Sequence, residues 1–242
     1  EALPLSDPQR IDREMTAERL LRQNRFEWVE ELPKWIQRST VIFRRGFPYS
    51  IWATPSEYAR SCSSLAKSTV IQQVDGFSNP FTDAHREKIE KSGHLPRVRG
   101  YARPQATRPE LEWMLTHATG LKELSLFSPR GHGSDPSWLG ELFHSESLRQ
   151  IGRLHLASGP EHGMTDADLM SHLADAPMTA LRALVIQRPS STVPVETTLL
   201  SGSLASQLES LTFQLPLHDS VPESLTGLQS LRHLEMRLNR NS

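Results

Sequence analysis

The chain has 242 residues, which is enough for one large domain or two small ones with a substantial core. Its 27 lysines and arginines nearly balance its 28 aspartates and glutamates, and this balance argues against a nucleic-acid binder that is basic over its whole surface. No apolar run approaches the roughly 18–20 residues that cross a bilayer, and we expect neither a membrane segment nor a secretory leader.

Residues 1–77 form the first predicted unit, a small α+β domain. Apolar residues at helical spacing from Thr16 to Leu32 predict one amphipathic helix or two short ones. The sequence R-R-G-F at 44–47 predicts a turn between short strands, and residues 56–67 predict a helix. Cys62 in that helix is expected in the core rather than as a nucleophile. As the single cysteine it has no partner for a disulfide or a thiolate metal site, so we expect a cytoplasmic protein.

Residues 78–120 are interpreted as an insertion that leads into the second half. A helix is predicted around 83–91, followed by a proline-containing loop over 91–109 that has basic residues and no acidic one. We expect this loop to be exposed and mobile. Its arginines and Tyr101 could grip a nucleic acid, but contact with an acidic protein surface, or no contact, is the favoured interpretation. The basic residues are Lys91, Arg97, Arg99, Arg103 and Arg108.

The second half, 121–242, repeats an apolar-x-x-apolar-x-apolar pattern. The repeats begin at Leu121, Ile151, Leu181, Leu208 and Leu231. Intervals of 30, 30, 27 and 23 residues separate these starts, close to the period of leucine-rich repeats. Return helices are predicted over 135–143, 165–176 and 198–208. The prediction is an α/β leucine-rich-repeat solenoid with parallel strands on the concave side and helices or irregular turns on the convex side.

The last repeat has no terminal element after it. Met236 is the third apolar residue of its motif, the segment after Arg237 is too short for a helix, and a repeat array needs an end with a polar outer face. We therefore expect further repeats, or self-association, to cover this edge.

Side chains alternate between the two faces of a strand, so the leucines are expected in the core and the residues between them on the concave face. Phe127 and Val185 are apolar residues in this outward set, as the core of an interface requires. The candidates for partner binding are Glu123, Ser125, Phe127, Arg153, His155, Arg182, Val185, Gln187, Glu209, Thr212, Gln214, His233, Glu235 and Arg237.

The sequence S-P-R-G-H-G-S-D at 128–135 has the residue types of a hydrolase site, but its context is that of a strand-to-helix turn. Asp135 before Pro136 is a helix start, and Ser134 has no glycine two residues after it, as a nucleophile elbow requires. The ten histidines lack metal-ligand spacing, so His155 and His233 are expected to be solvated. No phosphate-binding glycine motif is present, and we expect neither metal nor cofactor.

Residues 15–77 resemble a known companion of leucine-rich repeats. The matching features are a tryptophan-containing helix, the R-R-G-F turn, a helix, and an apolar-x-x-apolar strand. They involve Trp28, Trp35, Phe43, Arg44, Arg45, Gly46, Phe47, Leu65, Ile71 and Val74. The segment is similar to the N-terminal repeat-companion domain of a bacterial leucine-rich-repeat family, where it caps the repeats. The resemblance implies a solenoid without enzymatic chemistry.

The sequence therefore leads to a non-enzymatic scaffold or regulatory module that binds another protein on its concave face. Three alternatives stay open. The first is a regulatory or inhibitory subunit that holds an effector inactive or is itself cut by a protease at the exposed segment 91–109. The others are a nucleic-acid contact through 91–109 and a hydrolase.

Overall fold

One nine-stranded sheet runs through the molecule, and its strands follow in the order of the chain, β1 to β9. The computed structural model describes residues 10–30, 32, 34, 36, 41–44, 47–67, 71–75, 80–104, 107–127, 137–157, 172–173, 175–187, 204–216 and 228–239. β1 pairs antiparallel with β2, and β2 to β9 pair parallel. The chain is thus an α/β protein with a mostly parallel sheet.

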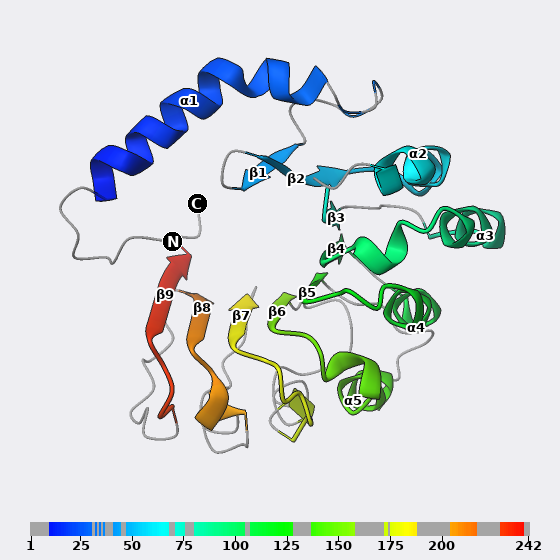
Figure 1. Cartoon of the computed structure of the whole chain (residues 1–242). Coiled ribbons are helices and arrows are strands. Elements are labelled where there is room, and N and C mark those ends of the chain that lie inside the picture. The colour runs from blue at the N-terminus through cyan, green and yellow to red at the C-terminus, as the bar shows by residue number, and fades with distance from the viewer. Residues whose placement is uncertain are drawn as a thin grey trace.

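The strands lie along an arc, with α2 to α5 on its outer side (Figure 1). The strands are β1 Ile42–Arg44, β2 Phe47–Trp52, β3 Gln73–Asp75, β4 Gly100–Pro104, β5 Glu123–Phe127, β6 Arg153–Ala157, β7 Ala183–Gln187, β8 Ser210–Pro216 and β9 His233–Asn239. The α-helices are α1 Arg10–Glu30, α2 Pro55–Lys67, α3 Asp83–Lys91, α4 Arg108–His117 and α5 Ser137–Phe143. Short 3-10 turns lie at Leu95–Arg97 (η2), Glu146–Leu148 (η3) and Ala205–Gln207 (η4).

Local sequence explains where the outer helices begin and end. At α2, the Glu57 carboxylate accepts hydrogen bonds from the Thr54 backbone N–H (2.8 Å) and hydroxyl (2.7 Å), and these bonds lower the pKa of Glu57. At α3, Thr82 and His85 form a reciprocal capping pair. Gly93 follows α3 with φ of +70°, a conformation that glycine adopts without steric cost.

The core lies between the sheet and the outer helices and is continuous along the arc. Register aligns one apolar residue from each parallel strand into a single row: Ile51, Val74, Tyr101, Leu124, Leu154, Leu184, Leu211 and Leu234. Most of these side chains are fully buried. The leucine spacing of the sequence is confirmed as this row, and Cys62 is confirmed as a core residue with 0% exposure.

Residues 91–109 are not the exposed, mobile loop that the sequence predicted. They contain the end of α3, η2, strand β4 and the start of α4. Val98 begins a further apolar-x-x-apolar unit that continues to Tyr101, so the 50 residues between Ile71 and Leu121 hold two units of 27 and 23 residues. The sequence pattern missed this unit because its third apolar position holds Arg103, which pairs in register with Leu126.

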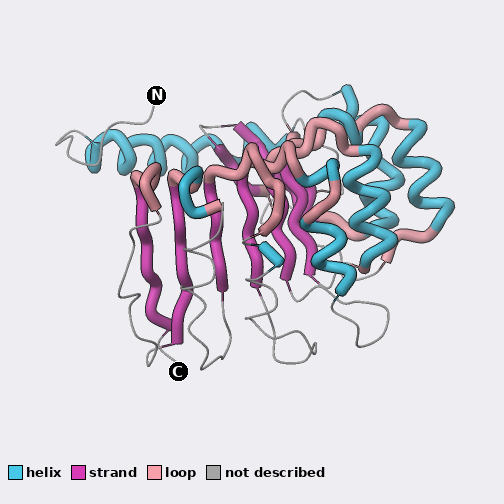
Figure 2. Tube along the Cα trace, turned by 90° about the horizontal axis from the view of Figure 1, so that it is seen from below, coloured by secondary structure: helices cyan, strands magenta, loops and turns pink. Residues whose placement is uncertain are grey.

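Helix α1 precedes the β1–β2 hairpin in the sequence. From its end near this hairpin it extends across the open side of the arc (Figure 1). Trp28 contacts Phe43 of β1, with 6.0 Å between ring centroids, and Val29 is buried. Seen from below, α1 lies level with one end of the strands rather than along them (Figure 2). The expected helix over 16–32 is thus one helix, and its described side chains from Asp12 to Leu20 are exposed rather than amphipathically packed.

Helix α5 confirms the predicted return helix over 135–143, with Trp138, Leu142 and Phe143 buried. The other two predicted return helices, 165–176 and 198–208, lie mostly outside the described residues. None of the helices in the described part of the chain is long and apolar enough to cross a membrane.

Candidate binding face

The face of the sheet turned away from α2 to α5, here called the open face, has two well-described rows of side chains. One row is Ser50, Gln73, Gly100, Glu123, Arg153, Ala183, Ser210 and His233. The next row is Trp52, Asp75, Ala102, Ser125, His155, Val185, Thr212 and Glu235. Burial alternates along β6 and β7, which places these residues opposite the core row.

Most of the predicted face residues lie on the open face. Those in strands with described side chains are Glu123, Ser125, Arg153, His155, Val185, Gln187, Thr212, His233 and Glu235. All except Thr212, which is 7% exposed, are half-buried or exposed. Phe127, Gln214 and Arg237 share the register of Gln187, but the orientations of their side chains lie outside the described structure.

Arg182 and Glu209 do not belong to the strands. Each lies one residue before its strand, and the register positions equivalent to Arg153 are held by Ala183 and Ser210. Arg182 donates to the Thr179 carbonyl (2.9 Å), and its Nε lies 3.8 Å from a Glu209 carboxylate oxygen. The sequence prediction placed these two strands one residue too early. Arg182 and Glu209 therefore lie just before β7 and β8 begin.

The five basic residues of 91–109 do not form a patch. Arg103 is buried against Glu110 on α4, while Arg108 contacts Glu112 and Glu141 at 2.7 Å each. Lys91 pairs with Glu87 at 2.5 Å, and Arg99 donates to the Gly120 carbonyl at 2.9 Å. Arg97 donates to the Ala66 carbonyl. All of these partners lie outside residues 91–109, and Glu110 follows that segment directly, which explains why the segment looked purely basic.

Tyr101 is also unavailable for stacking on a base. It is 1% exposed, and its hydroxyl donates to Glu110 Oε1 at 2.5 Å. The nucleic-acid contact proposed for 91–109 therefore loses its aromatic residue as well as its basic patch.

A hollow of about 220 Å³ lies in the open face over strands β3 to β7. Small residues create it, because β4 contributes only Gly100 and Ala102 to the two rows. A Cβ atom at Gly100 would lie 2.8 Å from Gln73 Oε1, so the Gln73 amide lies over the glycine. The hollow is lined by Gln73, Tyr101, Glu123, Leu124, Ser125, Arg153, His155 and Val185.

Asp75 adjoins the hollow and is held by neutral donors. The Ser50 hydroxyl donates to one carboxylate oxygen, and Gln73 Nε2 donates to the other at 2.7 Å. Burial raises the pKa of Asp75, and repulsion from Glu123 adds to the rise, while the bonds from Ser50 and Gln73 oppose it. The two carboxylates are therefore close enough to influence each other.

His155 lines the opposite side of the hollow. Burial lowers the pKa of its imidazole, and the Arg153 guanidinium lowers it further, although a hydrogen bond with Gln187 acts the other way. The imidazole is thus mostly neutral at pH 7, and the side chain is half-buried rather than solvated as the sequence predicted. Among the residues that the structure describes, no group of histidine, cysteine, aspartate or glutamate side chains could hold a metal ion.

Sequence reasoning missed the β2–β3 end of the face: Ser50, Gln73 and Asp75. A signal for two of them was available, since Ile71 and Val74 already fit the apolar-x-x-apolar pattern and predict outward positions at 73 and 75.

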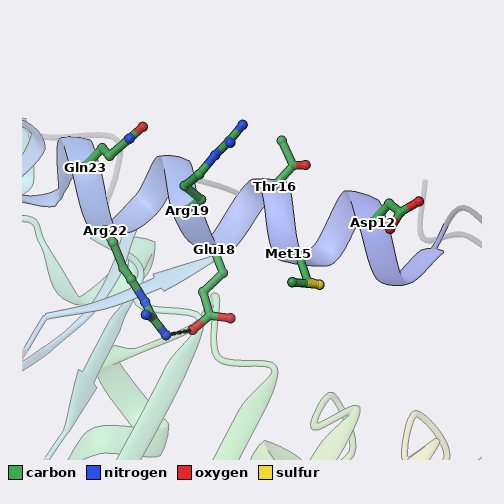
Figure 3. A pocket seen from close by; sticks show the side chains of 7 residues that line it. All are labelled: Asp12, Met15, Thr16, Glu18, Arg19, Arg22 and Gln23. Carbon is green, nitrogen blue, oxygen red and sulfur yellow. Dashed lines mark hydrogen bonds and ion pairs between the residues drawn. The ribbon is translucent and has the colours of Figure 1, made fainter.

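A second hollow, of about 710 Å³, lies along α1 (Figure 3). Its described lining is Asp12, Met15, Thr16, Glu18, Arg19, Arg22 and Gln23, all from one helix. Glu18 and Arg22 pair at 2.5 Å on the side of Met15, while Thr16 and Arg19 point the other way. These side chains do not converge, so this hollow is the weaker candidate.

The turn at 128–135, including Ser134, and Asp135–Pro136 lie outside the described residues.

A scan of the chain against protein-family models finds no match, and neither does a search among curated proteins.

Proposed function

We propose that this chain is a leucine-rich-repeat solenoid with a companion-type N-terminal cap, and that it acts as a non-enzymatic module that binds another protein on the open face. The observation that carries the proposal is the repeated exposure of polar residues in fixed rows on successive strands. Such rows can vary without disturbing the core, which is how repeat proteins build binding surfaces.

The composition of the face supports protein as the partner. Arg153, His155 and Val185 lie next to one another, so a cation, a neutral imidazole and an aliphatic side chain share one patch. Protein interfaces combine an apolar centre with polar surroundings in this way and are enriched in arginine. A nucleic acid would instead favour a consistently basic face, and Asp75, Glu123 and Glu235 interrupt it.

The test is capture by the full chain from a lysate of its source organism, followed by binding measurements with each purified candidate. Arg153→Glu should weaken a true partner about tenfold or more, because it reverses a charge in the middle of the face. Arg60→Glu is the matched control, since Arg60 is exposed on α2, on the helical side. A partner that is sensitive to Arg60→Glu and indifferent to Arg153→Glu would place the interface on the helices and overturn the proposal.

A further inference from the structure

The hollow in the open face has the size of a subsite for one side chain. Its volume of about 220 Å³ lies below the range of roughly 300–1,000 Å³ typical of small-molecule pockets. It is several times larger than the roughly 30 Å³ that one water molecule occupies in the liquid. The end of a long side chain fits such a space, whereas a cofactor does not.

Oxygen atoms dominate the side of the hollow formed by β3 to β5. Gln73 Oε1 lies over Gly100, where no side chain competes for the space. The Glu123 carboxylate and the Ser125 hydroxyl line the hollow, and Asp75 adjoins it through its hydrogen bond from Gln73. A guanidinium offers five N–H donors and an ammonium three, so a cation from a partner matches this set of acceptors.

Charge also favours a cation. The lining and the adjoining Asp75 contain two carboxylates and one guanidinium, that of Arg153. Arg153 is directly opposite Glu123 in the register and offsets it in part, while the side chains that donate to Asp75, Ser50 and Gln73, are neutral. His155 adds no charge at pH 7, since burial lowers the pKa of its imidazole. The lining residues and Asp75 together therefore carry one net negative charge.

We propose that the hollow receives one lysine or arginine side chain of the protein partner, held by the Glu123 carboxylate and the Gln73 amide oxygen, with the Asp75 carboxylate adding its negative charge from beside the hollow. The proposal rests on the proposed function, because it needs a protein bound to the open face. It narrows the partner to one that presents a basic side chain from a segment able to lie against the sheet.

The experiment selects 12-residue peptides from a displayed random library on the full chain and then measures the affinity of synthetic copies for variants. Peptides that bind the open face are recognised by their loss with Val185→Trp, whose bulk obstructs the middle of the face without changing its charge, and by their retention with Arg60→Glu. We expect these peptides to share a lysine or arginine whose replacement by glutamine weakens binding about tenfold or more.

Asp75→Asn and Glu123→Gln should each weaken the same peptides several-fold and remove the advantage of the basic residue. Glu87→Gln is the matched control, an exposed carboxylate on α3. Thermal unfolding shows whether each variant is folded. If Asp75→Asn disturbs the hydrogen bonds from Ser50 and Gln73, Glu123→Gln still tests the proposed contact. The proposed contact should also weaken as salt rises.

The outcomes separate the two proposals. Open-face peptides that lack a shared basic residue and ignore Asp75→Asn and Glu123→Gln would overturn the subsite while leaving the proposed function intact. Peptides that bind only elsewhere, and are therefore indifferent to Val185→Trp, would overturn both.

Discussion

Arg103 on β4 and Glu110 on α4 form an ion pair inside the core, with exposed fractions of 2% and 0%. In the register, Arg103 occupies the position that Leu126, Leu156 and Ile186 hold in the following strands. The pair therefore replaces an apolar contact between strand and helix by a charged one. Burial raises the pKa of Glu110, with the Tyr101 hydrogen bond and the Arg103 charge acting against the rise.

Arg103→Leu is expected to destabilise the protein by about 3–5 kcal/mol, although it restores the apolar residue of the other strands, because it leaves the Glu110 carboxyl buried without its cation. Urea unfolding followed by circular dichroism measures the change. The double variant Arg103→Leu with Glu110→Gln should recover most of the loss, since the amide can still accept from the Tyr101 hydroxyl. A single variant as stable as the parent would show that the pair contributes nothing.

Trypsin is expected to spare Arg97, Arg99 and Arg103, contrary to the expectation from sequence. These residues lie in or beside η2 and β4, and their side chains bond to Ala66, Gly120 and Glu110. Among the arginines that the structure describes, those of the exposed part of α1, Arg13, Arg19 and Arg22, should be cut earlier, because they lie in a helix segment with little packing. Mass spectrometry of the first fragments decides. First cuts at 97–103 would restore the mobile-loop interpretation.

Two glycines should respond differently to replacement by alanine. At Gly120 a Cβ atom would lie 2.4 Å from the backbone carbonyl oxygen of Pro96, so the backbone must move. At Gly100 it would meet the flexible side chain of Gln73, which can turn aside. We expect Gly120→Ala to cost about 1–3 kcal/mol, as for other overpacked sites, and Gly100→Ala clearly less. Thermal unfolding of both variants measures the difference, and equal losses would contradict these contacts.

Acid should destabilise the protein through His94. Its side chain is fully buried, and burial, aided by repulsion from Arg97, lowers the pKa of His94 to about 4. Between pH 6.5 and 4 the unfolded chain therefore binds a proton at this residue that the folded chain does not, so stability falls as the pH falls. The loss from pH 7 to pH 5 is about 2 kcal/mol.

Unfolding measured at pH 7, 6 and 5 tests this dependence. His94→Asn removes the titrating group, so the free energy of unfolding of this variant should change less over the same pH range. The control is His233→Asn, because His233 is an exposed histidine on β9. Asp75 and Glu110, whose pKa values are raised by burial, gain protons on folding and act in the opposite direction. Both are unchanged in His94→Asn, so comparing this variant with the parent isolates the effect of the imidazole. An unchanged slope in His94→Asn would assign the acid sensitivity to other groups.

The repeated apolar spacing of the sequence is by itself enough to locate five strands and their core-facing residues. Leu124, Leu154, Leu184, Leu211 and Leu234 lie in one register row, as their equal places in each repeat predicted. This succeeds because alternation along a strand is a local property, and one face of each strand must be apolar to be buried. Local apolar spacing likewise predicts the helices over 56–67 and 83–91, which are confirmed as α2 and α3.

The unit that contains Arg103 could be decided only by tertiary structure. Its pattern is broken by a charged residue, and the carboxylate that compensates it comes from the next helix, so no local rule could place Arg103 in the core. The hollow beside Asp75 depends likewise on residues that lie side by side in the sheet but 23 and 27 residues apart in sequence, Ser50 with Gln73 and Gln73 with Gly100. Periodicity along the sequence determines which face of its strand a side chain occupies. The neighbours of that side chain across the sheet are determined by how the chain folds back on itself, and these neighbours set its charge state and the free volume around it.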